Sequence, residues 1–261
     1  MRSFLAYMGG KSLLAGKIVS RIPDHQCYVE VFAGAAWILF KKDENMSHVE
    51  IINDINLDLV TLYRVVKHHL EEFIRYFKWI LVARDEFERF KSETPDSLTD
   101  IQRAVRFYYL LKSGYAARIK NPSFSIAATS KPRLNLLRIE DELSAVHLRL
   151  SRVYIDNRNY ADLIPKFDKP DTFFYIDPPY YGYENYYGDG VFYKSDFEKL
   201  RDILSTVQGK FILSINYVPE ILKLFKGFYI EGVDTSYSCG GADKKKKVTE
   251  LLIMNYEPTA R

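Results

Sequence analysis

Four consecutive residues, Asp177, Pro178, Pro179 and Tyr180, have the types and the order needed to activate an aromatic amine. Such an amine is a poor nucleophile because its lone pair is conjugated with the ring. A carboxylate and a backbone carbonyl that accept hydrogen bonds from both N–H groups favour a tetrahedral nitrogen and release that lone pair. Asp177 can supply the carboxylate, and Pro178 a carbonyl that the fixed φ of proline holds in place. Tyr180 adds a flat face for the ring. We therefore predict a catalytic site, with a surface turn after a strand as the alternative.

A pattern of strands, turns and helices predicts how this site is positioned. Residues 172–176 form an apolar run that indicates a buried strand ending just before Asp177. A strand over residues 27–32, a turn at Gly34, a short helix and a strand over residues 49–53 resemble a mononucleotide-binding half of a doubly wound sheet. Ligands of open α/β sheets bind beyond the carboxyl ends of the strands, which is where Asp177 is expected. Further strands are expected at residues 153–155, 211–214, 228–230 and 248–256.

The segment between the two groups of strands is predicted to be helical. Apolar residues recur at helical spacing from residue 57 to about residue 111, and residues 139–147 predict another helix. Residues 113–135 have no strong period and indicate a loop, whereas residues 195–198 match a capping box that opens a helix. We predict an α/β domain formed by residues 1–56 and 150–261, into which residues 57–149 insert as a helical domain.

Residues at the ends of the first two predicted strands are candidates for holding a nucleotide-like cofactor. Phe32 and Gly34 end the first strand, where a tight turn lets the backbone approach a ligand. Asp54 ends the second strand and follows Glu30 at a distance where an acidic residue can hold ribose hydroxyls. The alternative for Asp54 is a simple helix N-cap. The glycines before Lys11 do not complete a phosphate-binding loop, because Leu5 stands where that motif needs glycine.

The composition limits the class of protein. The formal net charge of +3 permits a nucleic-acid partner without demanding one, and the 20 tyrosines and 17 phenylalanines could stack on bases or simply pack a core. Cys27 and Cys239 are the two cysteines, and neither they nor the five histidines have metal-ligand spacing, so no metal is expected. No apolar run approaches the roughly 20 residues that span a bilayer. Glycine at Gly9 interrupts a signal-peptide core, so a cytoplasmic protein is expected.

Taken together, the motifs resemble the DNA adenine methylase (Dam-type) family of N6-adenine DNA methyltransferases, and the resemblance runs nearly from end to end. It depends on the joint order and spacing of six short segments. These are residues 7–11 (YMGGK), 30–34 (EVFAG), 53–56 (NDIN), 159–162 (NYAD), 177–180 (DPPY) and 246–252 (KKVTELL).

The resemblance implies a Rossmann-like, S-adenosylmethionine-dependent methyltransferase sheet with an inserted helical target-recognition domain. It implies that Tyr7 and Lys11 hold the cofactor, with Lys11 at the methionine carboxylate. The expected substrate is double-stranded DNA, from which the target adenine must leave the duplex to reach the methyl donor. A partner restriction endonuclease is compatible with this family. The complete set of expected cofactor-binding residues is Tyr7, Lys11, Glu30, Phe32, Gly34, Asp54 and Asp177.

The chain departs from the family pattern at three places. The family usually has proline where Val31 stands and a second glycine where Ala36 stands, and both changes are small. Relatives that read GATC carry an asparagine-valine-proline stretch after the inserted helices, whereas residues 124–129 here read FSIAAT. The sequence therefore predicts no particular recognition site, and it predicts no oligomeric state.

Two basic segments are candidates for contacting DNA. Arg118, Lys120, Lys131 and Arg133 lie in the predicted loop, and arginine bidentate to guanine is the commonest specific base contact. Lys244, Lys245, Lys246 and Lys247 follow two glycines and suit phosphates, with a solvated charge run as the alternative. Residues 181–187 are rich in tyrosine and predict an aromatic flap beside an extruded base, or a simple surface loop.

Three other functions are alternatives to adenine methylation of DNA. Methylation of cytosine N4 uses the same amine chemistry, but by resemblance serine more often replaces Asp177 in those enzymes. Methylation of RNA adenine is a further alternative. A DNA-bound regulator that retains the cofactor fold is a third, and the presence of Asp177 argues against it.

Overall fold

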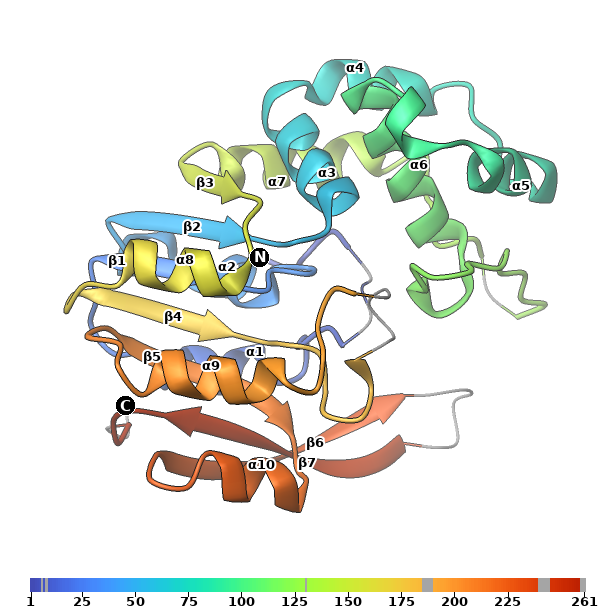
Figure 1. Ribbon diagram of the computed structural model, residues 1–261. Coiled ribbons are helices and arrows are strands. Elements are labelled where there is room, and N and C mark those ends of the chain that lie inside the picture. The colour runs from blue at the N-terminus through green and yellow to red at the C-terminus, as the bar shows by residue number, and fades with distance from the viewer. Residues whose placement is uncertain (6, 8, 130, 185–189, 239–244, 259–261) are drawn as a thin grey trace.

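The computed structural model describes residues 1–258 except 6, 8, 130, 185–189 and 239–244, with the backbone alone for residues 236–238 and 245–247. A seven-stranded sheet with the order β3-β2-β1-β4-β5-β7-β6 runs through the described part (Figure 1). Strands β1 to β5 are parallel, while β7 is antiparallel to both β5 and β6. The strands are β1 Cys27–Glu30, β2 Val49–Asn53, β3 Val153–Asp156, β4 Thr172–Ile176, β5 Lys210–Asn216, β6 Tyr229–Ser238 and β7 Lys245–Met254.

The strand order reverses between β1 and β4. From β1 the chain proceeds to β2 on one side, and β4 later pairs with β1 on the other side. Ligands of open α/β sheets bind in the crevice at such a switch point. The residues that follow β1 and β4, Phe32 and Asp177, are therefore at the place where this architecture forms a site.

Helices cover both faces of the sheet (Figure 1). One buried cluster contains apolar residues of α1 and α2, and a second contains those of α8, α9 and α10. Alternate strand residues point to opposite faces, so β4 places Phe173 and Tyr175 in the first cluster and Phe174 and Ile176 in the second. These helices are α1 Ala15–Val19, α2 Trp37–Lys41, α8 Tyr160–Phe167, α9 Asp196–Leu204 and α10 Pro219–Leu224.

The α-helices between residues 57 and 150 form the upper part of the molecule in Figure 1. Asn56 caps the first of them, because its side chain accepts the N–H groups of Asp58 and Leu59. Thr99 and Gln102 form a capping box at α6. The helices are α3 Leu57–His68, α4 Leu70–Phe77, α5 Arg84–Ser92, α6 Asp100–Ser113 and α7 Ile139–Leu150.

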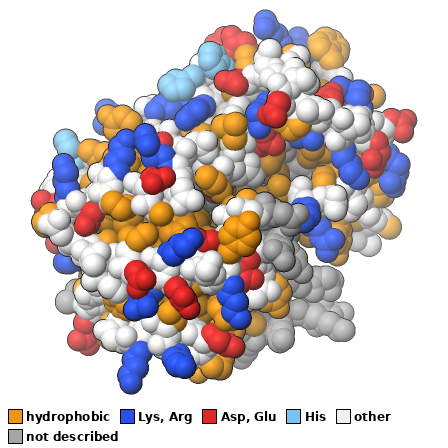
Figure 2. All heavy atoms as spheres, viewed as in Figure 1, with side chains coloured by type: hydrophobic (Ala, Val, Ile, Leu, Met, Phe, Trp, Pro, Cys, Tyr) orange, Lys and Arg blue, Asp and Glu red, His pale blue; other side chains and the backbone are white. Residues whose placement is uncertain are grey.

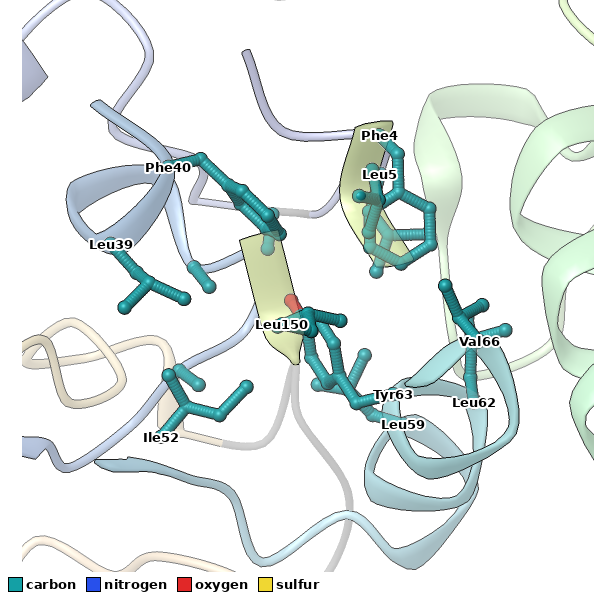
Figure 3. Close-up of a cluster of buried hydrophobic side chains, with 14 of the residues drawn as sticks. Phe4, Leu5, Leu39, Phe40, Ile52, Leu59, Leu62, Tyr63, Val66 and Leu150 are labelled. Atoms are coloured by element: carbon teal, nitrogen blue, oxygen red, sulfur yellow. The ribbon is translucent and has the colours of Figure 1, made fainter. Parts of the chain in front are cut away.

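The upper helices share a hydrophobic core with the sheet. Phe4 of the N-terminal segment packs edge-on against Phe40 of α2 and Tyr63 of α3 (Figure 3). Ile52 of β2 and Leu150 of α7 belong to the same buried cluster. This continuity fixes the helices relative to the site. The division into residues 1–56 and 150–261 against 57–149 stays a prediction.

The structure differs from the sequence-based prediction at residues 195–198. Ser195 has helical backbone angles, φ −67° and ψ −19°, and its side chain makes no capping hydrogen bond to the described residues. The predicted capping box is therefore wrong. Asp196 stabilises this end instead, because its carboxylate accepts the Tyr193 N–H at 2.7 Å and the Tyr160 hydroxyl at 2.9 Å. Within the described residues, no helix is both long enough and apolar enough to cross a membrane.

Candidate active site

Asp177 lies at the carboxyl end of β4 and is held by the neighbouring strand. The Ser214 hydroxyl of β5 donates to Asp177 Oδ1 at 3.1 Å, and a 2.8 Å hydrogen bond joins Ser214 to the Tyr175 hydroxyl. Pro178 and Pro179 are buried, while Tyr180 is half-buried. The sequence-based placement of this segment directly after a buried strand is confirmed.

Lys11 brings a positive charge to the predicted catalytic segment. Its ammonium lies 2.7 Å from Asp177 Oδ1 and 2.9 Å from Glu250 Oε1 of β7. It also donates to the Tyr180 hydroxyl at 3.0 Å and lies 4.6 Å from the centre of that ring. The side chains of Lys11 and Glu250 are almost fully buried, at 2% and 1% exposure, so this charge cluster is shielded from water.

Burial controls the protonation of two carboxyl groups at this edge. It raises the pKa of Asp177 to about 6, although the nearby Lys11 ammonium acts in the opposite direction. It raises the pKa of Glu30 to about 8, against hydrogen bonds from the Tyr28 hydroxyl and the Leu39 N–H. Asp177 is therefore ionised at neutral pH, when it can accept hydrogen bonds.

A pocket of about 270 Å³ opens beside Asp177 at the switch point of the sheet. Aromatic and aliphatic side chains provide most of its walls, and carboxylates provide most of its charge. All seven residues predicted to hold a cofactor line it. Its lining includes Tyr7, Gly10, Lys11, Glu30, Phe32, Gly34, Trp37, Asp54, Ile55, Asp177, Pro179, Val191 and Phe192.

Asp54 ties the turn after β1 to the turn after β2. Its Oδ2 accepts the Gly34 N–H at 2.9 Å, and its Oδ1 accepts the Asn56 N–H at 2.9 Å. Gly34 has φ +48°, a conformation that side chains strain, and an added Cβ would lie 3.2 Å from the Tyr7 ring. The helix-cap alternative for Asp54 is wrong, because Asn56 is the N-cap of α3.

The pocket suits a nucleoside that carries a positive charge. Flat apolar walls at Phe32, Ile55 and Phe192 can contact a base, and the Asp54 carboxylate can accept from ribose hydroxyls. With the pKa of Glu30 raised to about 8, the remaining carboxylates of the lining, Asp54 and Asp177, still outnumber Lys11, which favours a cation such as a sulfonium group. Because the Lys11 ammonium contacts Asp177 and Glu250, its predicted role at a methionine carboxylate stays a prediction.

Sequence reasoning missed Glu250, Ser214 and Tyr175 as site residues. The sequence does contain a signal for Glu250, which alternates with Leu252 and Met254, both buried on one face of β7. A charged residue on such a face needs a partner, and Lys11 supplies it.

The predicted DNA-contacting loop over residues 113–135 contains no strand among its described residues, and one isolated bridge closes residues 114–124 into a hairpin. Gly114 and Phe124 form an antiparallel bridge, with hydrogen bonds from Tyr115 to Ser123 and from Ser125 to Ser113. Phe124 anchors the hairpin by packing 5.5 Å, centroid to centroid, from the Phe87 ring of α5. The four basic side chains that were predicted to contact DNA in this loop are all exposed. They are Arg118, Lys120, Lys131 and Arg133.

Other predicted contacts are described only in part. Lys244 lies outside the described residues, and Lys245, Lys246 and Lys247 are described by their backbone in β7. Of the predicted aromatic flap over residues 181–187, residues 185–187 lie outside the described part as well. The hairpin, the segment after β4, the end of β6 and the start of β7 lie on the same side of the molecule, at the right of Figure 1. Figure 2 shows basic side chains interspersed with acidic ones over the drawn face.

Comparison with known families identifies the chain. Residues 7–239 match the family described as D12 class N6 adenine-specific DNA methyltransferase. The chain belongs to this family. It is therefore an adenine-specific DNA methyltransferase by family, and the α/β sheet described above is the fold expected of such an enzyme. The cytosine, RNA and regulator alternatives do not fit the family.

Individual relatives agree with this assignment. The Type II methyltransferase M.CviBI of Paramecium bursaria Chlorella virus NC1A is 24% identical over 98% of this chain and all of its own length. The Type II methyltransferase M.MjaIII of Methanocaldococcus jannaschii is 26% identical over 98% of this chain and 99% of its own. The DNA adenine methylase of Escherichia coli strain K12 is 29% identical over 69% of this chain and 65% of its own.

No cluster of three or more His, Cys, Asp or Glu residues in the described part of the chain is arranged to hold a metal ion. Cys27 is a free, partly buried thiol, and burial raises its pKa. Cys239 lies outside the described residues.

Proposed function

We propose that this protein transfers a methyl group from S-adenosylmethionine to N6 of an adenine flipped out of a short DNA sequence. The observation that carries the proposal is the placement of Asp177 and the following Pro-Pro-Tyr segment beside the pocket at the β1–β4 switch point. Family membership supports the reaction, and the chemistry of the pocket lining supports the cofactor.

In the proposed mechanism, Asp177 and the Pro178 carbonyl accept hydrogen bonds from the two N–H groups of the target amine. Each acceptor favours a tetrahedral nitrogen whose lone pair is free to react. S-adenosylmethionine, when bound, supplies the methyl group. Positioning and these two fixed acceptors account for most of the rate, because neither has to reorganise during the reaction.

The surrounding residues prepare Asp177 for this task. Ser214 donates to Oδ1 and thereby holds the carboxylate toward β5, while Lys11 contacts the same oxygen. These contacts leave Oδ2 as the acceptor for the amine. The Tyr180 ring, with the Lys11 ammonium near it, offers a surface on which the flipped base stacks.

The proposed cofactor contacts are of two kinds, namely hydrogen bonds to a charged carboxylate and packing against the walls of the pocket. Asp54 accepts from the ribose hydroxyls, and the turn at Gly34 lets the backbone approach the ligand. Glu30, Phe32 and Tyr7 complete the pocket on the β1 side. Lys11 links this pocket to the proposed catalytic carboxylate.

The proposed DNA surface contains the hairpin after α6 and the lysines at the start of β7. Arg118 and Lys120 are exposed on the hairpin, and Arg133 on the segment after it, where they can reach phosphates or base edges. Residues 57–149 would then act as the target-recognition part. A partner restriction endonuclease remains a prediction, to which the Type II names of two relatives lend support.

One experiment tests the reaction and finds the recognition site together. The full chain is expressed in a host that lacks its own DNA methylation, and the genome is read by single-molecule sequencing. We expect N6-methyladenine at one short motif, with no modification in cells expressing Asp177→Ala. Methylation of cytosine, or none with a folded wild-type protein, would contradict the proposal.

A further inference from the structure

Glu250 is a buried carboxylate whose place in the sheet ties it to the proposed reaction. Its Oε1 lies 2.9 Å from Lys11 Nζ, which lies 2.7 Å from Asp177 Oδ1. Glu250 is 1% exposed, so its charge is held away from water and needs a partner. Two carboxylates therefore share one ammonium group.

The sheet fixes the geometry of this arrangement. Glu250 pairs with Asn216 of β5 on one side and with Val233 of β6 on the other. Asn216 in turn holds the residue after the proposed catalytic segment, since its side chain accepts the Tyr181 N–H at 2.9 Å and donates to the Tyr181 carbonyl at 3.1 Å. β7 lies between two strands, so Glu250 and Asp177 keep a constant separation while Lys11 contacts both.

We propose that Glu250 is a positioning residue, which holds Lys11 between two carboxylates and so prevents this lysine from neutralising Asp177 alone. The inference rests on the proposed role of Asp177 as the acceptor for the target amine. A carboxylate that has an ammonium group to itself is a weaker hydrogen-bond acceptor for another donor, here the target amine. Sharing the ammonium with Glu250 keeps Asp177 fixed in place and still able to accept.

The groups around Asp177 determine in which direction its pKa should change when Glu250 is replaced. Burial is the main cause that raises the Asp177 pKa to about 6, Lys11 lowers it, and the negative charge of Glu250 raises it. Removing the Glu250 charge should therefore lower the pKa of Asp177. The other polar or titratable groups near it stay in place, namely Glu30 of β1, Tyr175 of β4, Ser214 of β5 and Tyr180.

The decisive variant is Glu250→Gln in the full chain, tested by single-turnover methylation of unmethylated DNA across pH 5 to 9. We expect the pH of half-maximal rate to fall by about half a unit or more, because a like charge near Asp177 is removed. We expect the rate above pH 8 to fall about tenfold, because Lys11 then holds Asp177 alone. A residue that only stabilised the fold would change the melting temperature and leave the half-maximal pH unchanged.

Glu231→Gln is the matched control. Glu231 is a glutamate on the adjacent strand β6 and pairs with Arg21 at 2.5 Å, away from Lys11. Its removal should leave the pH profile unchanged. If Glu250→Gln does not fold, Glu250→Asp keeps the charge but shortens the reach to Lys11, and we expect a lower rate above pH 8.

The outcomes separate this inference from the proposed function. A folded Glu250→Gln protein with the wild-type rate and half-maximal pH overturns the positioning role while Asp177 keeps its own. The same holds for a folded Glu250→Asp protein with the wild-type rate above pH 8. If Asp177→Asn retains full activity, the proposed role of Asp177 fails, and the role of Glu250 fails with it. The proposed function itself fails only if the folded wild-type protein methylates no adenine.

Discussion

Asp54 and Gly34 are joined by a 2.9 Å hydrogen bond from the Gly34 N–H to Asp54 Oδ2, which ties the ends of β1 and β2 across the pocket. We predict that Asp54→Ala weakens the binding of S-adenosylhomocysteine at least about tenfold, since hydrogen bonds to a charged group contribute about 1.5–3 kcal/mol. The preference among DNA sequences should be unchanged. Isothermal calorimetry measures the dissociation constant.

Thr99→Ala is the control for this prediction. Thr99 caps α6 and does not line the pocket, so its removal should cost about 1 kcal/mol of unfolding free energy. It should leave cofactor affinity nearly unchanged. An Asp54→Ala protein that binds as tightly as the wild type would restrict Asp54 to a structural role in the two turns.

The second prediction is that Asp177→Ala abolishes methyl transfer while the fold and much of the cofactor binding remain. Asp177 lies at a strand end with one oxygen held by Ser214, which leaves the other for the target amine. The measurement is the single-turnover rate on unmethylated DNA. Asp162→Ala, which removes an exposed aspartate of α8, should keep the wild-type rate. A decrease smaller than about tenfold, or 1.4 kcal/mol in the barrier, would contradict the assigned role.

The third prediction concerns pH. Burial raises the pKa of Asp177 to about 6, so the carboxylate is protonated below that pH and ionised above it. Only the ionised form accepts freely through both oxygens. The single-turnover rate should therefore be flat above about pH 7 and fall as pH drops through about 6. A profile with no change between pH 5 and 8 would mean that the protonation of Asp177 does not limit the reaction.

The position of Asp177 and the following Pro-Pro-Tyr segment could be predicted from the sequence because its signals are local. An apolar strand followed by an acidic residue and two prolines places Asp177 at a strand end without knowledge of the rest of the chain. The capping box at Ser195 was also predicted from a local pattern, and it was wrong. Ser195 adopts a helical conformation, and the Asp196 carboxylate accepts hydrogen bonds from Tyr193 and Tyr160 instead. Contacts with residues outside the helix therefore determine how the N-terminal end of α9 is stabilised.

The link from Lys11 to Glu250 could not be predicted in the same way. The two residues are at opposite ends of the chain, and they meet only because β7 pairs with β5 rather than ending the sheet. The buried face of β7 contains a charge at Glu250, which shows that a partner is needed without naming it. The order of the strands depends on the whole chain, and this order brings Lys11 to Glu250 as its partner.

The last prediction separates two kinds of DNA contact. If the lysines at the start of β7 touch phosphates, replacing Lys245 and Lys246 with alanine should weaken binding equally on all sequences. The slope of log affinity against log salt should flatten by about one for each phosphate interaction that the substitutions remove. If Arg118, exposed on the hairpin after α6, contacts a base edge, Arg118→Ala should cost about 1–3 kcal/mol at one position of the site.

Filter binding over a salt series distinguishes the two cases. The DNA substrates are the unmethylated recognition motif found by genome sequencing and its single-base variants. Lys166→Ala, on helix α8, which packs against the sheet, is the control and should change neither the slope nor the preference. Arg118 lies near the Tyr115 ring at 6.0 Å, so its guanidinium has one aromatic neighbour that can hold it in place. If Arg118→Ala weakens every sequence equally, it is another phosphate contact. The base-reading residue must then be sought elsewhere between residues 113 and 135, where Lys120, Lys131 and Arg133 are also exposed.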